Sequence, residues 1–246
     1  MSIKPRQITV SGVRVQVLRK AIKNLHLGVY PPQGRVRVAA PLRVSDDAVR
    51  LAVVGKLGWI KRQRARFAAQ PRESRREMVS GESHYVLGRR YRLRVIECEG
   101  PPTVAVRSRF IELQVRPGQG KTRREAVLER WYRQQLKLLI PPLIEKWQPI
   151  LGVALVAWGV KKMKTRWGTC NAEARRIWLN LELAKKPVQC LEYIVVHELA
   201  HLISRHHDER FVATLDKHLP QWRAHRARLG AEPLAYSTWM PEPTIP

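Results

Sequence analysis

The chain of 246 residues carries 46 Lys and Arg against 20 Asp and Glu, a formal net charge of +26. Its hydrophobic content of 44% is ordinary for a folded protein and argues against a disordered basic tail. The longest apolar run, residues 150–160, is too short to cross a bilayer, and the first residues lack the apolar stretch of a signal peptide. We therefore expect a cytoplasmic protein with no membrane partner.

The positive surplus predicts long-range attraction for polyanions, so a nucleic acid or a nucleotide is a candidate partner. The basic residues gather in three stretches, 56–76, 123–137 and 161–166, and none of these contains an RNA-binding or zinc-finger motif. Cys98, Cys170 and Cys190 are widely separated, and an odd, sparse set of this kind indicates reduced thiols rather than a disulfide scaffold.

The first part of the chain reads as strands followed by a helix and more strands. Apolar residues alternate over 13–18 and 25–29, and the Pro-Pro-Gln-Gly turn at 31–34 predicts a hairpin with 35–38. Ser45 with two following Asp residues predicts a helix start, and that helix should end before Pro71. A β-pattern returns over 84–116, and the break at 117–120 closes this part.

The second part alternates between helices and short strands. A helix is expected from about Thr122, with Pro141-Pro142 interrupting or kinking it. Strands are expected over 156–163 and 176–183. Helices should follow from near Pro187 and from near Asp208 to Pro220, then a short third one, before an irregular Pro-rich tail. The sequence shows no internal repeat and no low-complexity tract.

One short segment, His197-Glu198-Leu199-Ala200-His201, carries the clearest chemistry. On a helix, two histidines four residues apart project from one face, where both can bind one Zn²⁺ at about 2.0–2.1 Å. A carboxylate one residue after the first histidine lies beside such a metal and can take a proton from metal-bound water. This spacing is typical of zinc metallopeptidases.

A catalytic zinc needs three protein ligands and one open position. If the helix ends near Ser204-Arg205 and the chain turns back, either His206 or His207 could reach the metal, with Glu209 as an acidic alternative. The spacing alone leaves these three open. His26, His84 and His225 stand apart from this segment and are expected to be surface or structural residues.

The segment 196–201, followed by His207, Phe211 and Leu219-Pro220-Gln221-Trp222, resembles the YgjP-like metallopeptidases, which are related in their core to SprT-like and WLM-type zinc proteases. A second matching motif is Met163-Lys164-Thr165-Arg166-Trp167-Gly168-Thr169-Cys170, followed by Leu179-Asn180. The family typically reads WGSC there, so Thr169 is a conservative departure. The resemblance spans about residues 24–235.

The resemblance implies an α+β fold: a β-rich N-terminal part, then a small zincin-type core whose active-site helix packs on a short sheet. We accordingly expect a β-rich part with one helix over 1–118, the metallopeptidase core over 119–235 and the Pro-rich tail over 236–246. The resemblance also favours His207 as the third ligand of a single zinc ion, beside His197 and His201. It leaves His206 as a neighbouring, substrate-facing candidate.

The second motif suggests a substrate-binding edge. A strand at a sheet edge can bind an extended peptide through its backbone, and Gly168 would allow a close approach. Arg166 could bind an anionic substrate group or stabilise an oxyanion, unless it is a plain surface charge and Trp167 a core residue. Asn180 either ends a strand or hydrogen-bonds the site, and Tyr193 is expected to pack.

The sequence thus predicts a zinc-dependent peptidase that cleaves a peptide or protein substrate, with Glu198 as the general base that later protonates the leaving amine. Three alternatives remain open. The same site could hydrolyse a nucleotide phosphoanhydride, although no Gly-rich phosphate loop is present. The enzyme could cleave proteins associated with nucleic acid, as the likeness to SprT-like proteases suggests. The metal could also be purely structural, against which the motif argues.

Overall fold

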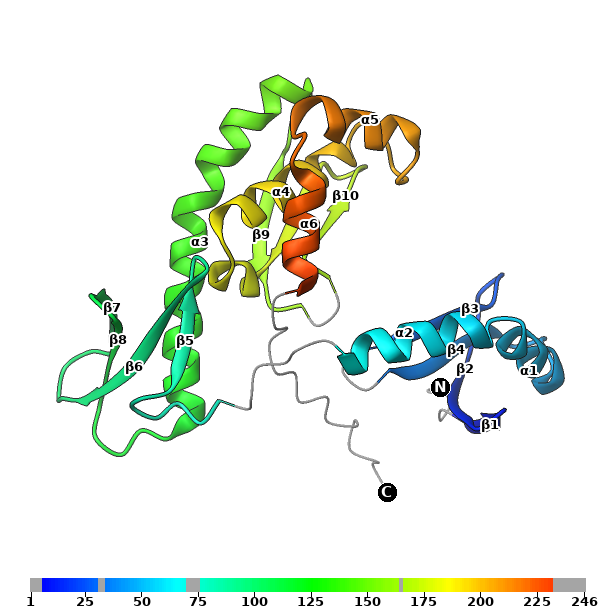
Figure 1. The fold of residues 1–246 in the computed structure, drawn as a ribbon, viewed down its shortest axis with the longest axis horizontal. Helices are drawn as coiled ribbons and strands as arrows, with labels where there is room; N and C mark the ends of the chain where they lie inside the picture. The colour runs from blue at the N-terminus through cyan, green and yellow to red at the C-terminus, as the bar shows by residue number, and fades with distance from the viewer. Residues whose placement is uncertain (1–5, 31–33, 70–75, 164–165, 232–246) are drawn as a thin grey trace. The chain divides into compact units, whose positions relative to one another are not determined.

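The computed structural model describes residues 6–30, 34–69, 76–163 and 166–231. Contacts divide the chain into two compact units, Met1–Arg72 with Ser237–Pro246, and Glu73–Tyr236. The α+β class expected from the sequence is confirmed, because the described residues form three small sheets and six α-helices (Figure 1). The predicted tail, 236–246, lies outside the described residues. No helix in the described part has the length and apolar character needed to cross a membrane.

A four-stranded sheet covered by two helices forms the N-terminal unit. Its elements are β1 Arg6–Val10, β2 Val13–Lys20, β3 His26–Tyr30, β4 Arg35–Pro41, α1 Asp46–Val54 and α2 Leu57–Ala69. The strand order is β1-β2-β4-β3, with β2 and β4 parallel. The predicted hairpin is confirmed as the antiparallel pair β3–β4, and its turn residues 31–33 lie outside the described residues.

The predicted helix after Ser45 is two helices rather than one. Ser45 caps α1 as expected, because its Oγ accepts a hydrogen bond from the backbone N–H of Ala48 at 3.2 Å. The helix then ends at Gly55, whose backbone N–H caps the last carbonyls. Glycine is a poor helix former, so the chain breaks there and restarts at Leu57.

The second unit begins with another four-stranded sheet. Its strands are β5 Ser83–Val86, β6 Arg89–Glu97, β7 Thr103–Arg107 and β8 Phe110–Val115. Their order, β5-β6-β8-β7 with β6 and β8 parallel, repeats the topology of β1–β4, although the sequence shows no repeat. The sequence grouped 76–118 with the N-terminal part, whereas the contacts group these strands with the helices that follow.

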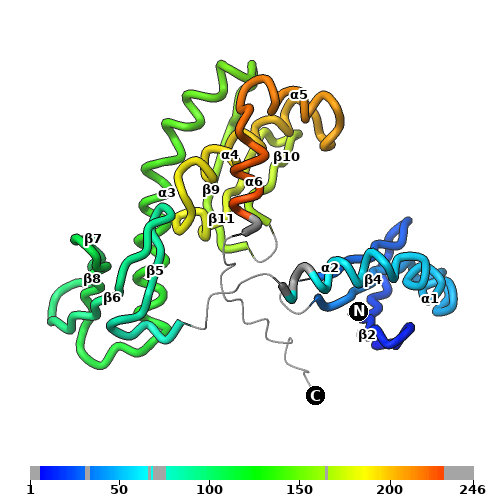
Figure 2. The backbone as a smooth tube through the Cα atoms, viewed as in Figure 1, coloured from blue at the N-terminus to red at the C-terminus, as the bar shows by residue number. Residues whose placement is uncertain are grey.

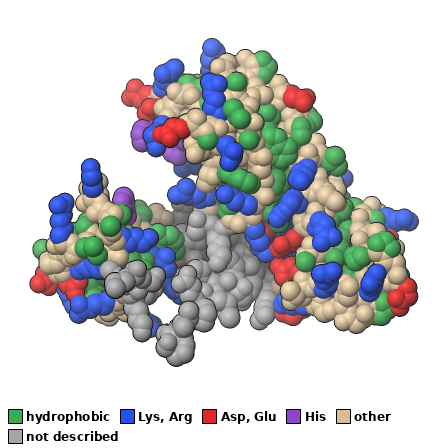
Figure 3. Space-filling view, turned by 180° about the vertical axis from the view of Figure 1, so that it is seen from behind, with side chains coloured by type: hydrophobic (Ala, Val, Ile, Leu, Met, Phe, Trp, Pro, Cys, Tyr) green, Lys and Arg blue, Asp and Glu red, His purple; other side chains and the backbone are tan. Residues whose placement is uncertain are grey.

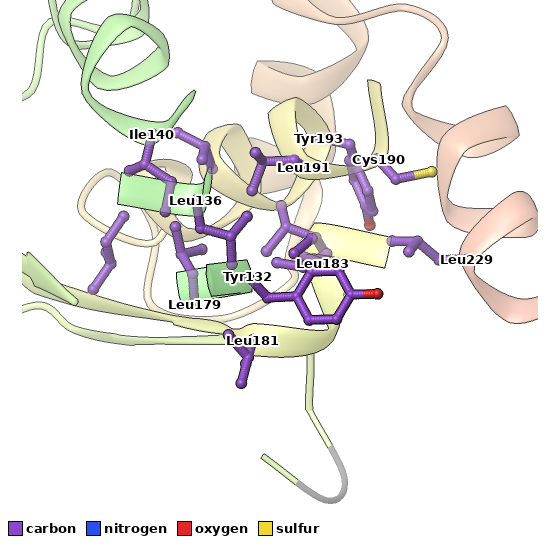
Figure 4. Close-up of a cluster of buried hydrophobic side chains, with 14 of the residues drawn as sticks. Tyr132, Leu136, Ile140, Leu179, Leu181, Leu183, Cys190, Leu191, Tyr193 and Leu229 are labelled. Atoms are coloured by element: carbon purple, nitrogen blue, oxygen red, sulfur yellow. The ribbon is translucent and has the colours of Figure 1, made fainter. Parts of the chain in front are cut away.

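The long helix α3, Lys121–Leu151, runs unbroken through Pro141, Pro142 and Pro149 (Figure 2). The sequence predicted that Pro141-Pro142 would interrupt or kink this helix, and the interruption does not occur. A proline removes its own N–H donor from the ladder and its ring crowds the carbonyl four residues earlier, and burial of one apolar side of the helix offsets these costs. That side includes Tyr132, Leu136 and Ile140, which belong to the buried cluster shown in Figure 4.

A three-stranded sheet follows α3. Its strands are β9 Ala157–Lys161, β10 Gly168–Asn171 and β11 Arg176–Asn180, in the order β10-β11-β9. The strand expected over 176–183 ends at Asn180, because the Asn180 side chain accepts from the backbone N–H of Glu182 at 3.2 Å and starts the 3-10 helix η1, Leu181–Lys185. Asparagine favours such caps over strand continuation.

The three C-terminal helices match the sequence expectation. They are α4 Val188–Ala200, α5 Glu209–His218 and α6 Trp222–Ala231. Helix α4 contacts β10 and β11 on one side and α3, α5 and α6 on others. It is apolar nearly all round, as a helix enclosed in a core must be. Its Leu191 and Tyr193 lie beside Cys190 in the cluster of Figure 4.

Candidate metal centre

Helix α4 places the first two candidate ligands on one face. His197 lies in its last turn and His201 caps its C-terminus, four residues later. Their ring centroids are 5.0 Å apart, and the planes are nearly perpendicular. Helix α4 is buried along most of its length and holds the backbone of both residues. The two side chains therefore leave the helix from fixed positions on the same face.

A tight turn after α4 delivers the third histidine. The Ser204 hydroxyl donates to the Asp208 carboxylate at 2.7 Å, and that carboxylate accepts the backbone N–H of Phe211 at 2.9 Å, which caps α5. This turn brings His207 Nε2 to 3.1 Å from His197 Nε2. One ring nitrogen from each of the three histidines lies within 4.8 Å of the others.

The three open alternatives for the third ligand lie in different places. His207 joins the cluster with His197 and His201. His206 is exposed, and its backbone carbonyl oxygen lies 3.2 Å from the Ser204 Oγ in the turn. Glu209 begins α5 and does not belong to the cluster. The identity of the bound metal ligands stays a prediction.

Phe211 forms an apolar wall behind the three rings. It is 2% exposed, and its ring centroid lies 5.0 Å from that of His197, 4.8 Å from that of His201 and 4.7 Å from that of His207. On another side, Tyr193 meets His197 edge to face at 5.7 Å and stacks on Trp222 at 6.2 Å. Tyr193 therefore packs, as the sequence suggested.

The protonation of these rings favours metal binding. Burial, reinforced by His201, His207 and Arg226, lowers the pKa of His197 to about 3. Burial also lowers the pKa of His201, whose Nδ1 lies 3.2 Å from the Ser204 carbonyl oxygen. That carbonyl can only accept, so Nδ1 carries the proton and Nε2 keeps its lone pair for a metal. Both rings are neutral at neutral pH.

The donor set fits zinc. Zinc binds imidazole nitrogens at about 2.0–2.1 Å, which places ligand nitrogens of a tetrahedral site roughly 3.3 Å apart. The separation of 3.1 Å between His197 and His207 Nε2 is close to that value. Without a metal one of these two Nε2 atoms can donate a hydrogen bond to the other, and with both deprotonated their lone pairs could bind one cation. The three nitrogens leave a fourth position free for water or substrate.

Glu198 follows the first of these histidines on α4 and is 4% exposed. A Cβ atom placed on Gly168 would lie 2.4 Å from Glu198 Oε1, so the backbone at the start of β10 directly contacts the carboxyl group. Burial raises the pKa of Glu198 to about 8, and the positive charge of Arg166 acts in the opposite direction. Sequence reasoning expected a close backbone approach at Gly168 but did not identify Glu198 as the group it meets.

The segment leading into β10 is held by one buried side chain, Asn180. Its Nδ2 donates to the carbonyls of Arg166 at 2.7 Å and Met163 at 3.0 Å, and its Oδ1 accepts the Met163 N–H at 3.2 Å. Asn180 thus both ends β11 and fixes the motif beside the site. Residues 164–165 of that motif lie outside the described residues.

The remaining motif residues divide between packing and exposure. Trp167 is half-buried and packs against the core, with Lys186 Nζ 5.9 Å from its ring centroid. Arg166 is exposed and close enough to influence Glu198 electrostatically. His84 is buried against Glu82 at 3.1 Å, which fits its expected structural role, and His26 is exposed.

A family model described as "YgjP-like, metallopeptidase domain" matches residues 23–232. The chain belongs to the YgjP-like family. The match covers both of the motifs that carry the resemblance found in the sequence and confirms it. This YgjP-like chain is therefore a metallopeptidase by family, and such a family implies a metal, for which the three-histidine cluster is the candidate site.

Comparisons with curated proteins and with solved structures add no functional assignment. No curated protein matches the chain. Among solved structures, a similar one is the "Crystal structure of the metallopeptidase zymogen of Pyrococcus abyssi abylysin", which is 22% identical. The match covers 36% of this YgjP-like chain and 89% of that one, with a TM-score of 0.34.

Proposed function

We propose that the chain is a zinc-dependent peptidase with a zincin-type core, in which His197, His201 and His207 hold one zinc ion and Glu198 is the general base. The observation that carries this proposal is the convergence of three imidazole nitrogens within 4.8 Å, on a helix whose next residue after the first ligand is the buried Glu198. When bound, zinc would polarise the scissile carbonyl and acidify a water molecule.

Two observations support Glu198 as the proposed proton acceptor. It follows the first ligand on α4, and its carboxyl group lies against the backbone of Gly168. In the proposed mechanism the ionised carboxylate, the form that a cation bound nearby would favour over the proton it otherwise holds, accepts the proton of the attacking water and then delivers it to the leaving amine. Its enclosure between α4 and β10 keeps bulk water from competing for that proton.

Strand β10 is proposed to bind the substrate backbone. It is an edge strand of its sheet, pairing with β11 on one side and with no other described strand on the other. An extended peptide could add there as a further strand, which would carry a carbonyl past Gly168 toward the metal. Arg166, exposed next to that edge, is proposed to bind a carboxylate or oxyanion of the substrate.

The test compares Glu198→Gln with the wild-type chain in two measurements. Zinc content by mass spectrometry should remain near one ion per chain, because the three imidazoles are unchanged. Cleavage of an unbiased peptide library should fall by about 10²–10⁴-fold, because the proton acceptor is lost. Wild-type levels of cleavage by the variant would contradict the assigned role of Glu198.

A parallel assay of phosphate release from nucleoside triphosphates controls for the substrate class. A peptidase should release no phosphate above a His197→Ala/His201→Ala variant that cannot hold the metal. Phosphate release that depends on Glu198, in the absence of any peptide cleavage, would overturn the peptidase proposal in favour of a phosphoanhydride hydrolase.

A further inference from the structure

The N-terminal unit has a large excess of basic over acidic residues. Residues 6–69 contain fourteen Lys and Arg and two acidic residues, Asp46 and Asp47, so their net charge is +12. Asp46 is already engaged by Arg6 and Arg19 at the start of α1. In the space-filling view, Lys and Arg side chains outnumber Asp and Glu on the visible surface (Figure 3). This unit lacks enough carboxylates to neutralise its own cations.

The sheet of this unit has one apolar face and one polar face. Val15, Val17, Val36 and Val38 point inward and are buried together with Val49 of α1. The alternate residues therefore point outward. The strand register places them in adjacent rows, with Arg37 between Gln16 and Gly28, and with Arg35 beside Tyr30.

We call this outward surface the basic sheet face and define it by six residues: Arg14, Gln16, Gly28, Tyr30, Arg35 and Arg37.

An aromatic ring lies flat across the basic sheet face. A Cβ atom on Gly28 would meet the Tyr30 ring at 2.7 Å, so the missing side chain of Gly28 is what lets this ring lie over the strand. Tyr30 is 41% exposed, and the Arg37 guanidinium lies 5.7 Å from its ring centroid. Arg37 Nε also donates to Gln16 Oε1 at 3.1 Å. The exposed Tyr30 ring therefore lies beside the half-buried Arg37 guanidinium.

The second sheet provides an internal comparison, because β5–β8 share the topology of β1–β4. The row equivalent to Gln16–Arg37 is Arg94–Glu112. There Glu112 lies 3.3 Å from Arg94 and 3.5 Å from Arg107, so an acidic residue neutralises the outward cations. The six residues of the basic sheet face include no acidic one, and the pKa of Arg35 is lowered by burial and by the charge of Arg37.

We propose that the basic sheet face is a binding surface for single-stranded nucleic acid. Exposed aromatic residues on a four-stranded sheet stack with unpaired bases, and adjacent cations contact the phosphates. Tyr30 supplies the stacking surface, and Arg14, Arg35 and Arg37 supply the positive charges around it. The inference rests on the N-terminal unit alone and does not depend on the proposed peptidase activity.

The test is a fluorescence anisotropy titration of the full chain with a labelled single-stranded 20-mer, as DNA and as RNA, and with the matched duplex. Wild-type protein should bind the single strand more tightly than the duplex, and binding should weaken steeply between 50 and 200 mM salt, a range chosen because phosphate contacts release counterions. Glu198→Gln should bind as wild type does, which separates this result from the catalytic one.

Matched variants separate a specific surface from bulk charge. Arg35→Glu/Arg37→Glu should weaken binding about tenfold or more, while Arg90→Glu/Arg92→Glu, with the same charge change on the second sheet, should alter it less than about threefold. Tyr30→Ala should weaken single-strand binding about fivefold or more, and Tyr30→Phe should retain it. Circular dichroism checks the fold, and Arg35→Gln/Arg37→Gln serves if charge reversal unfolds the unit.

Three outcomes would overturn the proposal. Equal weakening by the two charge-reversal pairs would show that net charge alone drives binding. Preference for the duplex would remove the role of Tyr30 stacking. Equal or tighter binding of polyglutamate would identify an acidic protein, rather than a nucleic acid, as the class of partner.

Discussion

Gly168 has no Cβ atom, and this absence leaves room for the side chain of Glu198. Its backbone lies against the carboxyl group of Glu198, and a Cβ atom at this position would stand only 2.4 Å from Oε1. We expect Gly168→Ala to displace that carboxyl group and to reduce kcat/KM on the order of 100-fold, since small misplacements of a reacting group have effects of this size. Zinc content should stay unchanged, because no histidine moves.

Thr169→Ser, in the same strand, is the matched control and should retain activity. The kinetic comparison with zinc analysis checks both variants. If Gly168→Ala cleaves as well as Thr169→Ser, the contact between β10 and Glu198 has no part in the reaction.

Some features of the site can be predicted from the sequence, and others depend on the folded structure. The two histidines four residues apart on a helix follow from helical periodicity alone, and the structure places them as expected. The choice between His206 and His207 depends on the turn made by Ser204 and Asp208, which spacing does not specify. The contact of Gly168 with Glu198 joins residues 30 positions apart, so only the folded chain reveals it.

At the level of elements, Asn180 connects β11, η1 and the segment before β10. Asn180→Ala removes a side chain that makes four hydrogen bonds, with both backbone groups of Met163, the Arg166 carbonyl and the Glu182 N–H. We expect a loss of about 2–4 kcal/mol in the free energy of unfolding, because buried partners are left unsatisfied. Urea denaturation measures it.

Asn180→Asp is the informative companion, since it keeps the acceptor oxygen but turns a second, charged oxygen toward the carbonyls of Met163 and Arg166. At neutral pH it should be destabilised at least as much as Asn180→Ala. A free energy of unfolding for Asn180→Ala within about 0.5 kcal/mol of wild type would show that other contacts hold this segment.

The packing of α3 against α4 includes one charged contact, which predicts a pH dependence. Lys146 and Trp147 donate to Glu192 Oε1 at 2.8 and 2.9 Å. Burial alone would raise the pKa of Glu192, but these bonds and the charges of Lys146 and His225 together hold it below 4.5. A carboxyl group with a lowered pKa in the folded state stabilises it above its unfolded pKa and loses that effect as the pH falls.

Glu192→Gln should therefore lower the free energy of unfolding at pH 7 by about 0.5–1 kcal/mol, since the contact is partly exposed. The difference from wild type should shrink as the pH is lowered through the folded pKa, below 4.5. Urea midpoints at several pH values measure this, with the exposed Glu145→Gln as control. A difference that stays constant down to strongly acidic pH would refute the role of this charge.

The observed helix boundaries agree with the sequence predictions where a capping residue marks the start of the helix. They differ from those predictions where tertiary packing determines the boundary. Ser45 and Asp208 each predicted a helix start, and each caps one through its side chain. The prolines of α3 predicted a break that burial of its apolar side overrides. Strand patterns located both four-stranded sheets, but their shared topology depends on parallel pairings between distant strands, which alternation alone does not specify.

For the whole molecule, the two units have separate hydrophobic cores. We expect thermal unfolding of the zinc-loaded protein to show two transitions, because each core can melt on its own. EDTA should lower only the transition of the unit that contains the three histidines, since a ligand stabilises only the structure to which it binds. Differential scanning calorimetry with and without chelator measures this, and equal shifts of both transitions would contradict it.

Helix α3 contacts β7, β8 and β9 as well as α4 and η1, and the Tyr132 hydroxyl donates to the Tyr85 carbonyl at 2.7 Å. The β5–β8 sheet and the helix that carries His197 therefore pack against the same helix, α3. A shortened chain that starts at residue 119 would retain every proposed zinc ligand. It would also expose to water the side of α3 that packs against β7 and β8. Engineers seeking a minimal enzyme should cut before residue 76.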